Sequence, residues 1–140
     1  MRPTIGILML DSQFPRIYGD VGNPNTWGFD VAIEVVPKAT PQAVVCRGED
    51  LLDQFIMAGQ RLVIQGVSGI TTTCGFLSIY QDKLSKVLGV PVLTSSLMQV
   101  ASVNATLPEG KRAAIITISA SALTTDYLRA AKVPLDTPIG

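Results

Sequence analysis

The stretch Thr71-Thr72-Thr73-Cys74-Gly75-Phe76 joins two different sequence patterns. The run before it, Leu62–Gln65 with the apolar residues that follow, is typical of a buried strand. Behind it, apolar residues recur at helical spacing as far as Leu88, and Gly89 stands where such a helix would end. A strand that turns directly into a helix is the basic unit of an α/β fold, and Cys74 falls on the turn.

The rest of the chain repeats this alternation. Further strand-like runs are expected at residues 4–10, 31–36, 91–94 and 111–118, and further helices at 49–60, after Ser95-Ser96 and after Ser119. Between the first two strands, residues 11–30 contain three glycines and two prolines and predict a long loop of the kind that often carries function. The alternation predicts an α/β fold with a parallel sheet that is flanked by helices and covered on both faces.

Composition excludes several classes of function. The 140 residues include eleven basic and eleven acidic side chains and no histidine. A Ser-His-Asp triad, a Cys-His dyad and a histidine-ligated zinc site are therefore impossible within this chain. The balanced charge argues against a nucleic-acid or membrane partner, and the start at Met1-Arg2-Pro3 does not resemble a secretory signal. With only two cysteines, we expect reduced thiols and a cytoplasmic protein.

Cys74 stands out among the remaining acid and base groups. A residue on a strand-to-helix turn lies beside the free N–H groups of the helix, which favour an anion and lower a thiol pKa. Ligands of parallel α/β sheets bind at the carboxyl ends of the strands. The residues expected there are rich in hydroxyls and favour a small carboxylate or phosphate. No glycine-rich nucleotide motif accompanies them.

The run from Gly66 through Cys74 to Leu77, continued by Gly89-Val90-Pro91 and Ser95-Ser96, resembles the aspartate/glutamate racemase superfamily. That superfamily also includes hydantoin racemases, maleate isomerase and arylmalonate decarboxylase. The resemblance implies a cofactor-independent isomerase, an amino-acid racemase, with two lobes around a small carboxylate and one thiol acid/base from each lobe. It also implies a homodimer. Carried over by position, it assigns proton transfer to Cys74 and substrate contacts to Asp11, Ser12, Thr73, Gly75, Phe76 and Thr117.

The chain departs from this pattern in one respect. Residues 1–108 match the first lobe with its cysteine motif, whereas residues 109–140 match only the opening strand and helix of a second, incomplete lobe. The second catalytic cysteine of the family would lie beyond Gly140, and Cys46 is expected to be structural. Two alternatives to a racemase therefore stay open. One is a decarboxylase or cis-trans isomerase of the same fold, and the other is a non-catalytic carboxylate-binding module.

Other residues are expected to have ordinary roles. We expect Arg16 to be a solvated loop residue, and Trp27 and Phe29 to anchor the long loop onto the core. Tyr80 and Tyr127 lie at helical spacing and are expected to pack in the interior.

Overall fold

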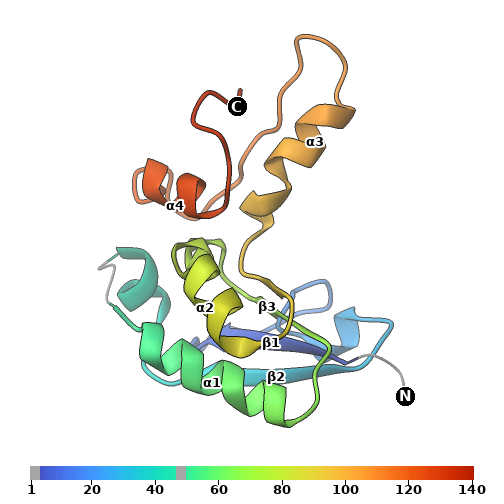
Figure 1. The fold of residues 1–140 in the computed structure, drawn as a ribbon, viewed down its shortest axis with the longest axis vertical. Helices are drawn as coiled ribbons and strands as arrows, with labels where there is room; N and C mark the ends of the chain where they lie inside the picture. Colours follow the sequence, from blue (N-terminus) through green and yellow to red (C-terminus); the bar gives the residue numbers. More distant parts are fainter. Residues whose placement is uncertain (1–3, 47–49) are drawn as a thin grey trace.

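The computed structural model describes residues 4–46 and 50–140 (Figure 1). Its centre is a four-stranded parallel sheet with the strand order β2-β1-β3-β4, as the sequence predicts. The strands are β1 (Ile5–Leu10), β2 (Val31–Val36), β3 (Gly69–Thr72) and β4 (Val92–Leu93). The helices are α1 (Leu52–Ile64), α2 (Gln81–Leu88), α3 (Val100–Thr106) and α4 (Thr125–Ala130). Short helical segments are η1 (Pro24–Thr26), η2 (Gln42–Cys46), η3 (Gly75–Tyr80) and η4 (Ser96–Gln99).

β1 is central because it is apolar along its whole length and pairs on both sides. Leu8 lies opposite Thr72 of β3, and Leu10 lies opposite Val36 of β2. Since all strands run in parallel, their carboxyl ends meet at one edge of the sheet. The residues that follow β1, β3 and β4 therefore gather there, and Cys74 is among them.

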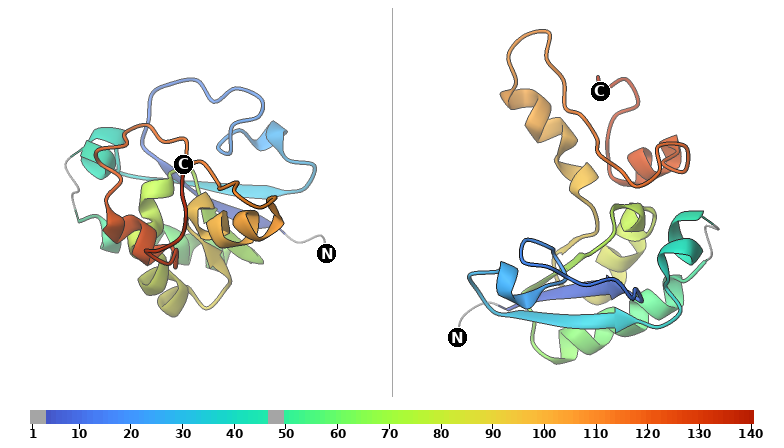
Figure 2. Two further views of the ribbon diagram at one scale, coloured as in Figure 1. Left: turned by 90° about the horizontal axis from the view of Figure 1, so that it is seen from above. Right: turned by 180° about the vertical axis from the view of Figure 1, so that it is seen from behind.

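The two faces of the sheet are covered differently. Helices α1 and α2 lie on one face and enclose the core around Leu8, Phe55, Leu62 and Leu84, all of which are fully buried. The opposite face is covered by the loop of residues 11–30, whose helical part is the three-residue segment η1 (Figure 2). Ile7, on that second face, is as fully buried as the residues beneath the helices.

The expected strand at Leu62–Gln65 is wrong, because this run is the last turn of α1. Phe55, Ala58, Gly59 and Leu62 are buried on one side of a continuous helix, so the apolar run follows a helical period. A short apolar run does not by itself distinguish a strand from a buried helix. The third strand begins later, at Gly69, while Glu49, the expected start of the helix, lies outside the described residues.

Among the described residues, 111–118 contain no strand, contrary to the sequence prediction. The segment is extended but makes only an isolated bridge between Ala113 and Ile139. Ile116 is 101% exposed and Ile118 is 80% exposed, so their apolar side chains are not covered by a neighbouring layer. The apolar run is therefore not the buried strand that its composition predicts.

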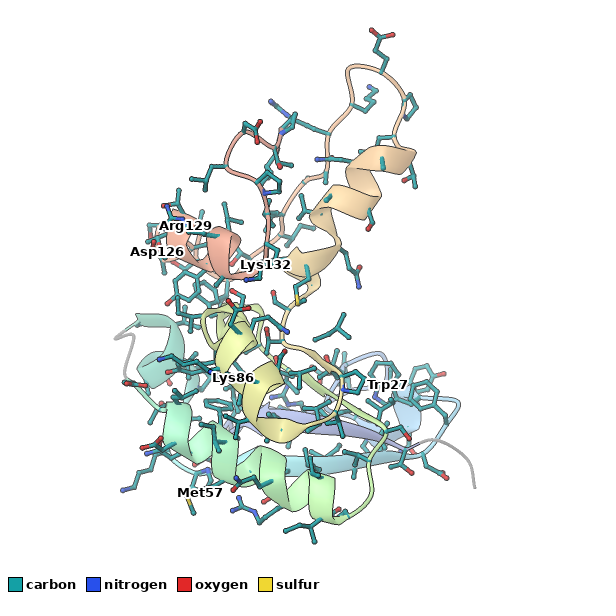
Figure 3. The ribbon with its side chains drawn as sticks, in the orientation of Figure 1. Trp27, Met57, Lys86, Asp126, Arg129 and Lys132 are labelled. Atoms are coloured by element: carbon teal, nitrogen blue, oxygen red, sulfur yellow. The ribbon has the colours of Figure 1, made fainter. Side chains whose placement is uncertain are left out.

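The residues beyond η4 form a separate projection above the sheet (Figure 1). A small apolar cluster holds it together, with Leu97, Val100, Ala113, Ala131 and Val133 as its buried members. α4 packs on η3. An ion pair joins the projection to α2, with Lys132 Nζ 2.7 Å from Asp82 Oδ2 (Lys132 is labelled in Figure 3). The division into a first lobe ending at residue 108 and the opening of a second lobe stays a prediction. In the described part of the chain, every helix is too short or too polar to cross a membrane.

Candidate active site around Cys74

Cys74 lies where β3 turns into η3, as the sequence predicts. Thr72 fixes the turn from inside: its hydroxyl donates to the Thr94 carbonyl at 2.7 Å, and its oxygen accepts the Cys74 N–H at 3.2 Å. Thr73 fixes it from the side of β1, because its hydroxyl oxygen accepts the Leu10 N–H at 3.2 Å. Cys74 is therefore held by both neighbouring strands and not by a flexible loop.

A buried glutamine supports the same edge of the sheet from α2. The Gln81 carbonyl oxygen accepts the Thr94 N–H at 2.9 Å and the Thr94 hydroxyl at 2.6 Å. Its amide nitrogen donates to the Val92 carbonyl at 2.8 Å and to Ser85 Oγ at 2.8 Å. Gln81 thus joins β4 to the helix behind Cys74, and nothing in its sequence context indicates this role.

Cys74 opens onto a pocket of about 310 Å³, which we call the Cys74 pocket. Its floor is the carboxyl edge of the sheet, and its far wall is the extended segment Ile115–Ile118 with Leu123. The predicted site residues Thr73, Gly75, Phe76 and Thr117 all line it together with Cys74. The other two, Asp11 and Ser12, do not line it.

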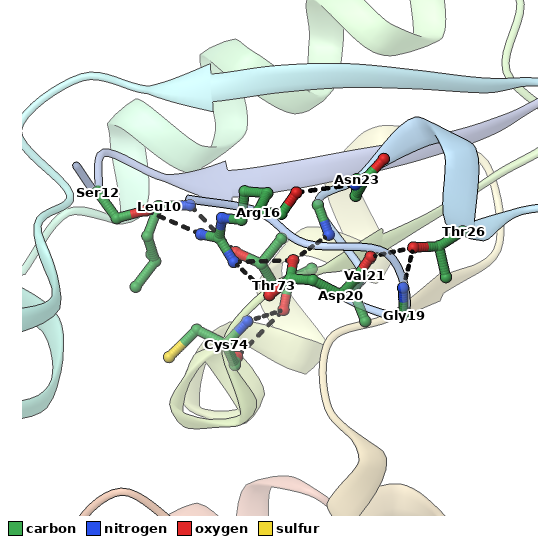
Figure 4. A network of polar contacts seen from close by, with 12 residues as sticks. Leu10, Ser12, Arg16, Gly19, Asp20, Val21, Asn23, Thr26, Thr73 and Cys74 are labelled. Atoms are coloured by element: carbon green, nitrogen blue, oxygen red, sulfur yellow. Dashed lines mark hydrogen bonds and ion pairs between the residues drawn. The ribbon is translucent and has the colours of Figure 1, made fainter. Parts of the chain in front are cut away.

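Ser12 is linked to the Cys74 pocket through Arg16. Its hydroxyl accepts a hydrogen bond from Arg16 Nη2 at 2.9 Å, and Arg16 does line the pocket (Figure 4). The Asp11 N–H donates to the Ala39 carbonyl at 3.0 Å and so ties the chain after β1 to the chain after β2. Asp11 therefore supports the site through its backbone hydrogen bond, and Ser12 through its hydrogen bond with Arg16.

Arg16 is the site residue that the sequence prediction placed in solvent. Its side chain is only 16% exposed and forms an ion pair with Asp20, with Nη1 and Oδ1 3.1 Å apart. Its guanidinium lies over the Phe14 ring, 4.4 Å from the ring centroid, and its buried Nε has no hydrogen-bond partner among the described residues. Figure 4 shows the guanidinium between Ser12 and Asp20, beside Thr73 and Cys74. A lone arginine in a loop carries no sequence signal for this position.

The expectation of a lowered Cys74 pKa is wrong in direction. Burial of the side chain raises the pKa of the Cys74 thiol above its ordinary value. The N–H groups of Phe76 and Leu77, at the start of η3, oppose this rise, as does the positive charge of Arg16. The sequence argument considered the turn and the helix but not the loss of water around the thiol. Burial thus disfavours the Cys74 thiolate, and the N–H groups of η3 and the Arg16 charge partly offset this effect.

A second hollow of about 290 Å³ adjoins the first, and we call it the Trp27 pocket. Thr73, Cys74, Gly75 and Ser96 line both pockets, so Cys74 lies between them. The remaining walls of the Trp27 pocket come from β3, from β4 and from Val21 and Trp27 of the long loop. Trp27 thus borders this hollow, while its ring packs within the loop on Phe29, which is exposed and does not anchor the loop onto the core.

The second thiol, Cys46, is exposed at the end of η2, so it is not a packing residue of the core. Within residues 4–46 and 50–140, no group of three or more histidine, cysteine or acidic side chains is arranged to hold a metal ion. The site consists of one thiol, one arginine, several hydroxyls and apolar walls.

The sequence relatives of this chain all carry the same name, dimethylsulfoniopropionate lyase. The chain is 34% identical over 124 residues to dimethylsulfoniopropionate lyase 7 of Emiliania huxleyi, a match that covers 86% of this chain and 36% of the relative. It is 28% identical over 125 residues to a dimethylsulfoniopropionate lyase of Durusdinium sp. clade D, covering 86% of this chain and 41% of the relative. The chain thus spans about a third of the length of the first relatives that it matches. No family model matches.

A solved structure of arylmalonate decarboxylase, a doubly substituted variant in its liganded form, is also similar. The TM-score is 0.48 with 18% sequence identity, over 74% of this chain and 46% of that chain. Membership of the racemase superfamily stays a prediction.

The sequence relatives correct the predicted reaction. They are named lyases, which cleave bonds, whereas a racemase is an isomerase and only inverts a centre. The prediction of an amino-acid racemase is therefore wrong. Of the alternatives left open by the sequence, a bond-cleaving enzyme such as a decarboxylase agrees better with these names.

Proposed function

We propose that this chain carries the Cys74 site of a cofactor-independent lyase that acts on a small carboxylate with a leaving group on its β-carbon. The observation that carries the proposal is the position of Cys74, a thiol held by two strands in a pocket that also contains Arg16. Similarity to dimethylsulfoniopropionate lyases supports this reaction class, and dimethylsulfoniopropionate is the proposed substrate.

The chemistry of that substrate defines what the site must do. Dimethylsulfoniopropionate carries a carboxylate on one end and a positively charged sulfonium on the other, two carbons away. A base removes a proton from C2, and the electron pair of that C–H bond becomes the new C2–C3 double bond. The C3–S bond breaks and its electrons leave with sulfur. The products are acrylate and neutral dimethyl sulfide, and the base keeps the proton.

In the proposed reaction the Cys74 thiolate is this base. A thiol is the natural candidate because the chain has no histidine. Burial raises the Cys74 pKa, which makes the thiolate a stronger base once it forms, and the N–H groups at the start of η3 and the Arg16 charge oppose this rise. The charge that develops on the substrate carboxylate as C2 loses its proton is stabilised by the Arg16 guanidinium. Ile115, Ile118 and Leu123 provide an apolar wall beside the reacting carbon.

We also propose that the chain forms a homodimer. The Cys74 pocket is open, and its wall at Ile116 and Ile118 is exposed, so a second copy of the chain could cover it. A homodimer predicts a solution mass of about twice the 14.9 kDa of one chain, measured by light scattering. A monomer at all concentrations contradicts this part of the proposal and leaves the chemistry of Cys74 unaffected.

The lyase reaction is tested by incubating the purified chain with dimethylsulfoniopropionate and measuring acrylate by NMR and dimethyl sulfide in the headspace. Equal amounts of both products are expected, with loss of both in Cys74→Ala. Cys46→Ala is the matched control, because it removes an exposed thiol that lines neither pocket, and it is expected to keep the activity. Absence of both products, or an unchanged rate in Cys74→Ala, contradicts the proposal.

A further inference from the structure

Each of the two pockets beside Cys74 has a distinctive residue in its lining. Arg16 lines the Cys74 pocket only, and Trp27 lines the Trp27 pocket only. Their shared wall contains the thiol. A ligand that occupies both pockets would have the thiol between its two ends, with Arg16 among the residues around one end and Trp27 among those around the other.

The charged and polar groups around the two pockets determine which end of such a ligand each pocket favours. In the Cys74 pocket the Arg16 side chain is 16% exposed and is paired with Asp20, which offsets part of its positive charge. Its guanidinium N–H groups still favour a carboxylate over a cation at this end. The described lining of the Trp27 pocket contains no charged side chain of either sign. Thr71, Thr94 and Ser95 contribute hydroxyl oxygens to it instead. A cation is therefore not repelled in the Trp27 pocket as it is beside Arg16.

Trp27 is held in a fixed position. Its indole N–H donates to the Val21 carbonyl at 3.0 Å, and its ring packs on Phe29 with the ring centroids 5.4 Å apart at an angle of 42°. Because the N–H group is already used within the loop, the part of Trp27 left for a ligand is its π system. The face of a tryptophan ring is the best aromatic partner for a cation, above all for a methylated onium group that has no hydrogen-bond donor.

We propose that Trp27 binds the onium end of a β-onium carboxylate while the carboxylate lies beside Arg16, so that C2 is presented to Cys74. This inference rests on the proposed function and adds a specificity-determining residue to it. It assigns the selection of a positively charged leaving group to an aromatic face and not to an acidic side chain.

The test uses two ligands of the same shape and different charge. 3-(Trimethylammonio)propionate carries a quaternary ammonium, whereas 4,4-dimethylpentanoate has a neutral carbon at the same place. Their affinities are measured by NMR titration of the purified chain and of Trp27→Leu. Loss of the ring is expected to weaken binding of the ammonium ligand about tenfold and to leave the neutral ligand within about twofold. Trp27→Phe, which keeps an aromatic face, is expected to retain more of the affinity for the ammonium ligand.

Tyr18→Leu is the matched control, because Tyr18 is an aromatic residue of the same loop that is 78% exposed and lines neither pocket. It is expected to change neither affinity. If Trp27→Leu weakens both ligands equally, or neither, the aromatic recognition of charge is overturned while the carboxylate site stands. If neither ligand shifts the amide signals of Thr73, Cys74 and Gly75 in the unsubstituted chain, the proposed function itself fails.

Discussion

The Leu10 N–H donates a hydrogen bond to the Thr73 hydroxyl oxygen at 3.2 Å, which joins the last residue of β1 to the residue directly before Cys74. The Thr73 N–H in turn donates to the Leu8 carbonyl at 3.1 Å, so the pairing of β1 with β3 continues one residue past the end of β3. The position of the thiol is thus determined by the central strand of the sheet. Substitutions that loosen this strand edge are expected to change the reactivity of Cys74 as well as stability.

Arg16→Gln is expected to raise the pKa of Cys74 further, because the Arg16 charge favours the thiolate and the glutamine carries none. The measurement is the pH dependence of Cys74 alkylation by iodoacetamide, followed by mass spectrometry, and the midpoint is expected to move to higher pH. In the unsubstituted chain the midpoint is expected above that of an ordinary thiol, because burial disfavours the charged form.

The matched control for this prediction is Arg61→Gln. Arg61 is also paired with an acidic side chain, Glu34, but it belongs to α1 and lines neither pocket. Its loss is expected to leave the alkylation midpoint of Cys74 unchanged. A midpoint that is equally unaffected by Arg16→Gln would show that the loop arginine does not act on the thiol.

Thr72→Val is expected to destabilise the fold by about 1–3 kcal/mol, because it removes the buried partner of the Thr94 carbonyl and of the Cys74 N–H. The free energy of unfolding in urea measures this cost. Thr71→Val is the neighbouring control: its hydroxyl donates to the Leu93 carbonyl at 2.9 Å in an exposed position, where water replaces the lost donor. Equal costs for the two substitutions would contradict the role given to Thr72.

Gln81→Met keeps the length of the side chain but removes all four of its hydrogen bonds. Gln81 is 6% exposed, so the groups left behind on Val92 and Thr94 have little access to water. The expected loss is about 2–4 kcal/mol in the free energy of unfolding. Gln60→Met, on the exposed side of α1, is expected to stay within about 0.5 kcal/mol of the unsubstituted chain.

Ile116→Thr is expected to change the free energy of unfolding by less than about 0.5 kcal/mol, because the Ile116 side chain is fully exposed. Ile70→Thr makes the same chemical change at a position that is 2% exposed. It is expected to cost several times more, since a buried methyl group is lost and a hydroxyl is placed in the core. A large loss of stability in Ile116→Thr would mean that residues 111–118 are covered after all.

The parts of the fold that the sequence predicts well are those with a strong local signal. The apolar runs of β1 and β2 form strands, and Gly89 ends α2 in the left-handed conformation with φ of 69°. Cys74 does lie on a strand-to-helix turn, although the run Leu62–Gln65 that suggested the strand belongs to α1 and the strand itself is Gly69–Thr72. The Ser95 side chain accepts the Leu97 N–H at 3.1 Å, as expected of a helix cap.

The parts that were missed depend on burial and on contacts between distant residues. The run at 111–118 has the composition of a core strand, but no neighbour pairs with it along its length among the described residues. Arg16 and Trp27 lie in a loop without periodicity, and only the folded chain brings them to the two sides of Cys74. The sequence does not predict the direction of the Cys74 pKa shift for the same reason, since a local motif does not show desolvation.

The central claim is that the Cys74 thiolate removes the proton next to a bound carboxylate. The most direct measurement is the exchange of the C2 protons of 3-(trimethylammonio)propionate for deuterium in heavy water, followed by NMR in the presence of the chain. The account predicts exchange that depends on Cys74 and is faster at higher pH, lost in Cys74→Ala and retained in Cys46→Ala. Exchange that continues at the same rate in Cys74→Ala, or no exchange with the unsubstituted chain, would contradict it.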